Sequence, residues 1–237
     1  MKLMINRIEK RVEKLLENID SLDKRAYLTV TGEGDILRKK MNLAVPCMVY
    51  CENDELFQTQ LEKEIDFKER QKDKDISRLS NVDLVKAVDI FTKVVIKGEL
   101  EFAKRYGKEL ALRDKELFYK TLFNLSLMDN IKFKKPLMAL AFKEIMEVIG
   151  WNDKIGYLVI SYFTKQRYDL NEFENAKEYI GEEFEVEESL DLVAYKKVLE
   201  SYEYKNSKKY RYILKKENEK LEKKEMLNIE QEILKTI

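Results

Sequence analysis

Residues 136–163 read PLMALAFKEIMEVIGWNDKIGYLVISYF and contain two strongly apolar segments. Pro136 suits the first turn of a helix, because its nitrogen has no hydrogen to donate there. Gly150 is typical of a helix end, and Asn152 of the residue that caps the next helix. Apolar residues recur every three to four positions: Leu137, Leu140, Ala141, Ile145, Met146 and Ile149, then Ile155, Leu158, Val159, Tyr162 and Phe163. The stretch therefore predicts two consecutive helices, each with one buried face.

The residues on either side continue this pattern of short helices. Helices are expected to start near residues 80, 99, 114, 135, 152 and 170. Ser80 with Asp83 predicts a capping box, Asp114 predicts a cap, and Gly98 and Gly181 predict helix ends. Alternate starts lie about 34 to 38 residues apart, close to the length of one helical hairpin. The pattern predicts an all-α fold, either an irregular stack of antiparallel helical hairpins or a compact helical bundle.

The first residues predict an amphipathic helix over 3–22. Its apolar positions alternate spacings of three and four, as in a coiled-coil seam: Ile5, Ile8, Val12, Leu15, Ile19 and Leu22. Two interpretations remain open. The helix packs on the body of the same chain, or it forms the seam of a homodimer.

Residues 26–34 are the least helical part of the chain. Ala26 to Thr31 are rich in β-branched and aromatic residues, so a short strand or an extended loop is expected there, with Gly32-Glu33-Gly34 as a turn. Asp35 is then expected to cap a helix that starts at Ile36 and ends near Val45, before Pro46.

A further helix is expected over 52–72, with Leu56, Leu61 and Ile65 as core positions. The charged run at 68–74 indicates a solvated helix end or a linker.

The last part, 189–237, predicts long charged helices joined near Asn206-Ser207. The final helix is polar enough either to project from the body or to pack on a partner. The sequence thus divides into an N-terminal helical region (1–75), a core of helical hairpins (76–188) and charged C-terminal helices (189–237).

Composition supports the helical prediction and excludes several kinds of catalytic and metal site. The 237 residues include only 7 Gly and 2 Pro, too few for the turns of an all-β protein. There is no histidine, so imidazole bases, Cys-His nucleophile pairs and ordinary zinc sites are excluded. No signal peptide or membrane span is visible, and the two cysteines, Cys47 and Cys51, are expected to be reduced and buried. A cytoplasmic protein is predicted, with residue usage typical of an AT-rich bacterial or phage genome.

Carboxylates are the remaining candidates for catalysis or metal binding. Glu144 and Glu147 flank the apolar face of the helix opened by Pro136, at a spacing that suits one side of a hard-metal site. Two solvated surface acids explain the same pattern. The Gly32-Glu33-Gly34 turn matches neither a phosphate-binding loop nor a dinucleotide fingerprint, and no cofactor is predicted.

Charge is unevenly distributed near the C-terminus, although 45 basic and 45 acidic residues balance overall. Residues 172–191 are strongly acidic and residues 196–224 strongly basic. The basic part interleaves tyrosines with cations, namely Tyr202, Tyr204, Lys205, Lys208, Lys209, Tyr210, Arg211 and Tyr212. Rings that stack on bases and cations that bind phosphates are what a single-stranded RNA or DNA surface requires. Two other interpretations are tyrosines packed inward under solvated lysines, and neutralisation of the acidic stretch by the basic one.

These features lead to one main functional hypothesis and two alternatives. The main hypothesis is a non-enzymatic helical protein, such as an adaptor, an inhibitor or an immunity-type protein, that binds another protein. The first alternative is a single-stranded nucleic-acid-binding protein that uses residues 196–224. The second alternative is a carboxylate- or metal-dependent enzyme.

Overall fold

The computed structural model describes residues 2–66, 80, 82–221 and 226–237. These residues form twelve α-helices, two short 3-10 helices and one two-stranded sheet: α1 (Lys2–Asn18), η1 (Ile19–Ser21), β1 (Leu28–Val30), β2 (Ile36–Arg38), α2 (Ala44–Tyr50), α3 (Asp54–Glu64), α4 (Leu84–Lys97), α5 (Leu100–Arg113), α6 (Lys115–Met128), η2 (Ile131–Phe133), α7 (Lys135–Ile149), α8 (Asp153–Lys165), α9 (Asn171–Asn175), α10 (Leu190–Ser201), α11 (Ser207–Glu219) and α12 (Asn228–Thr236). The all-α prediction is confirmed.

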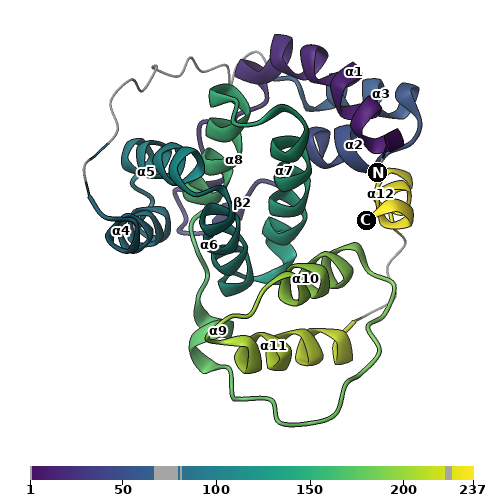
Figure 1. Ribbon diagram of the computed structural model, residues 1–237. Helices are drawn as coiled ribbons and strands as arrows, with labels where there is room; N and C mark the ends of the chain where they lie inside the picture. Colours follow the sequence, from purple (N-terminus) through teal and green to yellow (C-terminus); the bar gives the residue numbers. More distant parts are fainter. Residues whose placement is uncertain (1, 67–79, 81, 222–225) are drawn as a thin grey trace.

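Helix α7 lies at the centre of the molecule. Helices α2, α6, α8 and α10 pack around it, and α5 packs against α4, α6 and α8 on one side (Figure 1). Both apolar segments of the opening stretch are buried, including Leu137, Ile145 and Val159. Of the two arrangements that the sequence leaves open, the structure shows the compact bundle. None of the described helices is long and apolar enough to span a bilayer.

Several helix ends form where local chemistry predicts them. The side chains of Asp114 and Asn152, both predicted caps, accept hydrogen bonds from backbone N–H groups in the first turns of α6 and α8. Asp83 caps α4 in the same way, in place of the predicted Ser80. Gly98 ends α4 with a φ of 80°, a conformation that glycine adopts without strain. Pro136 lies in the first turn of α7, as predicted.

The predicted helix from Ile36 to Val45 is wrong. Residues Ile36–Arg38 form strand β2, which pairs antiparallel with β1. Helix α2 begins only at Ala44 and includes Pro46 in its first turn. A proline is tolerated there because the first N–H groups of a helix have no partner within it. Pro46 therefore helps to start a helix that it was expected to stop.

Three other boundaries differ from the predictions. The helix expected over 52–72 is α3, which ends at Glu64, and the charged run at 68–74 lies outside the described residues. The helix expected over 170–180 is the five-residue α9, and the residues after it, up to 189, form neither a helix nor a strand. Ser80 is not part of a cap: its N–H and hydroxyl donate to the buried carboxylate of Glu109 at 2.8 Å each.

The first and last helices pack on the same part of the molecule. Helix α1 buries Ile8 and Leu15 against α2 and α7 of the same chain, so its seam is already covered. Helix α12 packs on α2 and α10 and buries Ile229 and Ile233, which corrects the expectation of a helix that projects or waits for a partner. Figure 1 shows α12 on the same side of the molecule as α1 and α2.

The single tryptophan, Trp151, lies between α7 and α8. Its ring makes edge-to-face contacts with Phe118, Phe142 and Tyr157 at centroid distances of 5.9, 6.0 and 6.4 Å. The indole N–H donates to Asp153 at 2.5 Å. These contacts join α6, α7 and α8 into one aromatic cluster.

One hydrophobic core runs through all three regions that the sequence suggests. It contains Ile8 and Leu61 from the first region, Phe142 from the second, and Tyr195 and Ile233 from the third. The predicted boundary near residue 75 lies outside the described residues.

Candidate functional site

Residues 28–38 form a β-hairpin that we call the arm. Leu28 pairs with Arg38, Thr29 with Leu37 and Val30 with Ile36. The turn closes when the Thr31 N–H donates to the Asp35 carbonyl at 2.9 Å and the Gly34 N–H to the Thr31 carbonyl at 3.0 Å. Gly34 has a φ of 92°, which a residue with a Cβ adopts only under strain.

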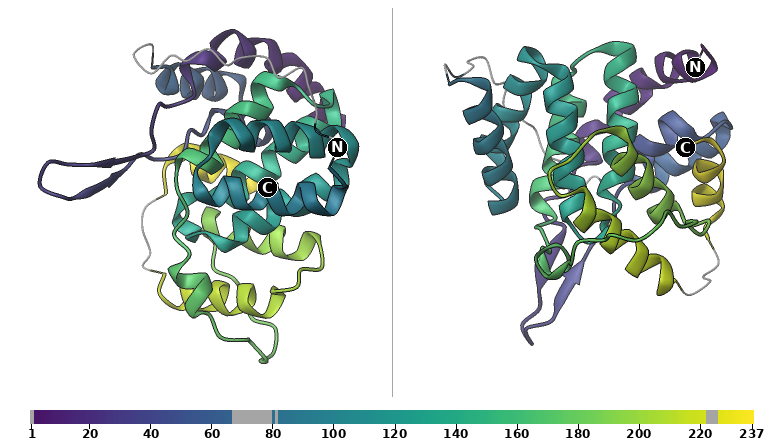
Figure 2. Two further views of the ribbon diagram at one scale, coloured as in Figure 1. Left: turned by 90° about the vertical axis from the view of Figure 1, so that its left-hand side faces the viewer. Right: turned by 60° about the horizontal axis from the view of Figure 1, so that its bottom comes forward.

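The arm stands clear of the helices (Figure 2, left). Val30, Ile36 and Leu37 are 60%, 62% and 58% exposed, and none of the described helices covers either face of the hairpin near them. Large apolar side chains on both faces of a short projecting hairpin make it unstable by itself in water. A hairpin strand whose outer edge is unpaired is a template on which a strand of another chain can pair.

The base of the arm is firmly attached to the body. Tyr27 is buried and contacts the Tyr162 ring edge-to-face at 4.9 Å. The Arg38 guanidinium lies over the Phe133 ring at 4.6 Å and donates to the Gln166 carbonyl at 3.0 Å. The arm is therefore held in a defined direction while its outer part remains accessible.

The basic tyrosine-rich segment does not form an open surface on which bases could stack. The Tyr204 and Tyr210 rings are buried, and their hydroxyls donate to the Val198 carbonyl at 2.9 Å and to Asn124 at 2.8 Å. Tyr202 is half-buried and donates to Glu116 at 2.9 Å. Tyr212 is also half-buried. Stacking on bases needs exposed ring faces, which Tyr204 and Tyr210 do not offer in this structure.

The cations of this segment divide into two groups. Lys205, Lys208 and Arg211 are exposed, whereas Lys209 lies over the Phe173 ring at 5.2 Å. Lys208 pairs with Glu178 at 3.3 Å.

The acidic stretch after α9 runs alongside α11. The Tyr179 N–H donates to the Lys208 carbonyl at 3.1 Å, and the Asn218 side chain joins the backbone of Glu185 and Glu187. Lys216 pairs with Glu172 at 2.8 Å. These contacts support the interpretation that the acidic and basic stretches neutralise each other.

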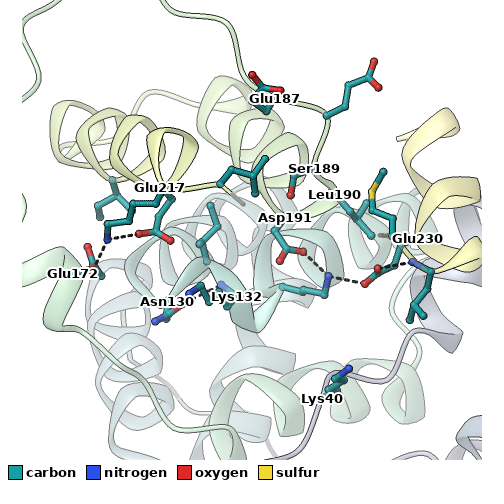
Figure 3. Close-up of a pocket in the computed structure, with 18 residues that line it drawn as sticks. Lys40, Asn130, Lys132, Glu172, Glu187, Ser189, Leu190, Asp191, Glu217 and Glu230 are labelled. Carbon is teal, nitrogen blue, oxygen red and sulfur yellow. Dashed lines mark hydrogen bonds and ion pairs between the residues drawn. The ribbon is translucent and has the colours of Figure 1, made fainter. Parts of the chain in front are cut away.

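A polar pocket of about 1050 Å³ lies where η2, α11 and the segments before α10 and α12 meet (Figure 3). Lys134 is its central cation and lies between Asp191 and Glu230, at 2.5 and 2.9 Å. On the other side, Lys220 pairs with Glu217 at 2.9 Å. Figure 3 shows these pairs inside the pocket, so both Lys134 and Lys220 are bound to acids of the same chain.

The pKa shifts in the pocket follow from this pairing. Burial opposes the charge on Lys134, but Asp191 and Glu230 outweigh it and raise the pKa of the lysine. Burial raises the pKa of Asp191 despite Lys134. Burial also disfavours the ionised form of Glu230, but the hydrogen bond and charge of Lys134 outweigh it and lower its pKa. The pocket is a network of ion pairs that ties η2, α10 and α12 together.

The two acids named from the sequence have different surroundings. Glu147 pairs with Lys115 at 2.9 Å, which lowers the pKa of its carboxyl, whereas burial raises the pKa of Glu144. Within the described residues, no group of three or more Asp, Glu, Cys or His side chains is placed to hold a metal ion.

Cys47 and Cys51 are buried free thiols, as predicted. A hydrogen bond to Cys51, together with burial, raises the pKa of the Cys47 thiol, although Arg11 nearby opposes the shift. The thiol is thus poorly suited to act as a nucleophile.

The sequence pattern predicts the turn of the arm but not Ile36 and Leu37 as surface residues, because Asp35 resembles a helix cap. The available signal was symmetry about the glycines. Leu28-Thr29-Val30 and Ile36-Leu37-Arg38 are two short apolar runs on either side of one Gly-containing turn.

Comparison of the chain with protein-family models, curated proteins and solved structures finds no match.

Proposed function

We propose that this protein is a non-enzymatic interaction protein that binds another polypeptide through the arm. The observation that supports this most directly is the exposure of Val30, Ile36 and Leu37 on a hairpin held firmly at its base. A bound strand would shield these side chains and satisfy the free backbone groups of the hairpin edge, as in strand addition to a sheet edge. We also propose a cytoplasmic location, where the two thiols stay reduced.

The two alternatives receive less support. A single-stranded nucleic-acid surface at 196–224 would use rings that the fold buries, and Lys208 and Lys216 already pair with acids of the same chain. A site built on Glu144 and Glu147 would have to break the pair between Glu147 and Lys115.

Photo-cross-linking from the arm tests the proposal. A photoreactive amino acid replaces Leu37 in one variant and Val85 in another, because Val85 is also highly exposed, at 74%, but lies on α4. Cells that express each variant are irradiated, and the cross-linked peptides are identified by mass spectrometry. We expect a polypeptide adduct from position 37 and none of the same kind from position 85.

Affinity then decides whether the adduct reflects binding through the arm. The identified polypeptide is purified and titrated with the parent protein and with Leu37→Asp and Val85→Asp variants. We expect at least a ~100-fold weaker Kd for Leu37→Asp only, because a charge would be buried at the contact. The absence of an adduct from position 37, or equal affinities of all three proteins, would overturn the proposal.

A further inference from the structure

We infer that the polypeptide paired with the arm is a second copy of this chain, and that two β2 strands pair antiparallel to build one four-stranded sheet. This inference rests on the proposed function, because it names the partner of the same surface. The unpaired edge of β2, the hydrogen-bond register of the hairpin and the charges along the arm support it.

The edge of β2 is more accessible than that of β1. Strand β1 follows the buried Tyr27, and Leu28 is half-buried, so the body covers the start of that edge. Every residue of β2 is exposed, as are the turn before it and the two residues after it. A second strand can therefore approach β2 along its full length.

The hydrogen bonds of the hairpin determine which groups of β2 point outward. The pairs Thr31 with Asp35 and Tyr27 with Lys39 are hydrogen-bonded. Because bonded and non-bonded pairs alternate in an antiparallel ladder, Leu37 also bonds inward and Ile36 and Arg38 direct their N–H and C=O groups outward. Within the described residues, no hydrogen bond from the rest of the chain reaches those outward groups.

One register satisfies these groups in a symmetric pair. With a two-fold axis at Leu37, Ile36 of each copy lies opposite the partner's Arg38, and both residues use their outward groups. Leu37 then faces the partner's Leu37 as a non-bonded pair, whose Cα atoms lie about 4.5 Å apart. This is the self-complementary contact that a two-fold dimer requires.

Charge supports an antiparallel pairing of two identical arms. The turn carries Glu33 and Asp35, and Lys39 and Lys40 follow β2, whereas Arg38 is held against Phe133 of its own chain. In the register above, the acidic turn of each copy lies alongside the basic stretch of the other. Opposite charges across paired strands favour this arrangement, whereas parallel pairing would place like charges together.

The side-chain pattern indicates how a second copy would stabilise the arm. On one face, the two Leu37 side chains cover each other. On the other face, Val30 and Ile36 form an apolar cross-strand pair within each copy, and the two Ile36 side chains lie diagonally across the axis. Three or more strands with an apolar face are stable where an isolated hairpin is marginal. Pairing therefore stabilises an arm that the body holds only at its base.

Disulfide trapping tests the register directly. A Leu37→Cys variant places two thiols across the two-fold axis, within the Cα separation of about 4.4–6.8 Å that a disulfide needs. Ile36→Cys is the matched control, since its exposure is nearly the same but two copies of position 36 lie diagonally, at about 7–8 Å. Cys47 and Cys51 are fully buried and do not compete in the folded protein. We expect rapid dimer formation under mild oxidation from Leu37→Cys and little from Ile36→Cys.

Sedimentation equilibrium measures the association of the unmodified full chain. We expect a dimer whose Kd rises roughly 100-fold in Leu37→Asp, because two like charges would face each other at the axis, and stays unchanged in Val85→Asp. A monomer at all concentrations, equal cross-linking at positions 36 and 37, or a dimer insensitive to Leu37→Asp would each overturn the inference. A monomer that still gives an adduct with a different protein from position 37 would overturn this inference alone and leave the proposed function standing.

Discussion

At the scale of single residues, Arg11 is the most connected side chain of the first helices. Its guanidinium donates to the carbonyls of Cys47, Met48 and Cys51 at 3.3, 3.1 and 2.7 Å. It also pairs with Asp54 at 2.7 Å. Helix α2 has no basic residue in its last turn, so a cation from α1 compensates the partial negative charge at its C-terminal end.

We expect Arg11→Met to lower the free energy of unfolding by about 3 kcal/mol, because three buried carbonyls would lose a charged donor. Lys10→Met is the matched control. Lys10 pairs with the same Asp54, but its side chain is 72% exposed, so its loss should cost less than about 1 kcal/mol. Urea denaturation of both variants measures the difference. Equal effects would show that the carbonyl contacts of Arg11 contribute nothing.

Asp54 makes the stability that this cluster contributes depend on pH. Hydrogen bonds from Lys10 and Arg11 lower the pKa of its carboxyl to about 2, from an ordinary value of 3.8. A lowered pKa means that the unfolded chain takes up the proton first as the pH falls. The contribution of Asp54 is thus fully present above the unfolded pKa and is lost as the pH falls toward about 2.

We therefore expect Asp54→Asn to be less stable than the parent protein by a constant amount above about pH 5, with the difference shrinking between pH 4 and pH 2. Urea unfolding at a series of pH values measures both curves. Curves that stay parallel down to pH 2 would contradict the assignment of the shift to Asp54.

At the scale of elements, Gly107 sets the distance between α5 and α8. A Cβ at this position would overlap Cδ1 of Ile160 and lie 3.0 Å from the Phe91 ring. We expect Gly107→Ala to destabilise the protein by about 1–3 kcal/mol through overpacking, despite the higher helix propensity of alanine. Thermal unfolding measures the effect.

A second substitution separates overpacking from other causes. Ile160→Val removes the Cδ1 atom with which the new methyl group would collide. We expect the double variant Gly107→Ala/Ile160→Val to be more stable than the sum of the two single changes predicts. Strict additivity would mean that Ile160 does not limit the approach of the two helices.

The elements also show what sequence can and cannot predict here. The caps at Asp114 and Asn152 were predictable because a cap depends on a side chain and the next three backbone N–H groups, whereas α4 is capped by Asp83 and not by Ser80 as predicted. The arm was only half predictable. Ile36 and Leu37 suit a helix as well as a strand, and pairing with residues 28–30 decided between them.

The candidate surfaces depended on long-range packing in the same way. Tyr204 and Tyr210 alternate with cations in the sequence, which does not reveal that both rings face inward. Tyr210 contacts α6 and Phe173, and Tyr204 contacts the Tyr210 ring and the Val198 carbonyl. Which side of a charged helix is buried is a property of its neighbours, which a single helical pattern does not reveal.

At the scale of the whole molecule, α12 completes a core shared by the first and last parts of the chain. Ile233 is fully buried, Glu230 pairs with Lys134, and the Thr236 hydroxyl donates to the Tyr50 carbonyl. Helix α2 is therefore covered by residues that lie more than 170 positions further along the chain.

We expect Ile233→Ala to lower the free energy of unfolding by about 2–4 kcal/mol and to shift a single cooperative transition. Leu227→Ala is the matched control, because Leu227 is 52% exposed and its loss should cost less than about 0.5 kcal/mol. Calorimetry distinguishes one transition from two. A separate early transition, affected alone by Ile233→Ala, would show that the last helix unfolds independently.

The position of Trp151 has a practical consequence for all these experiments. It is the only indole of the chain, and its ring neighbours belong to α6, α7 and α8 rather than to the arm. Its fluorescence emission therefore reports solvent entry into the centre of the bundle. Pairing of the arm should leave that emission unchanged, so loss of structure and association can be followed as two separate optical and hydrodynamic signals in one sample.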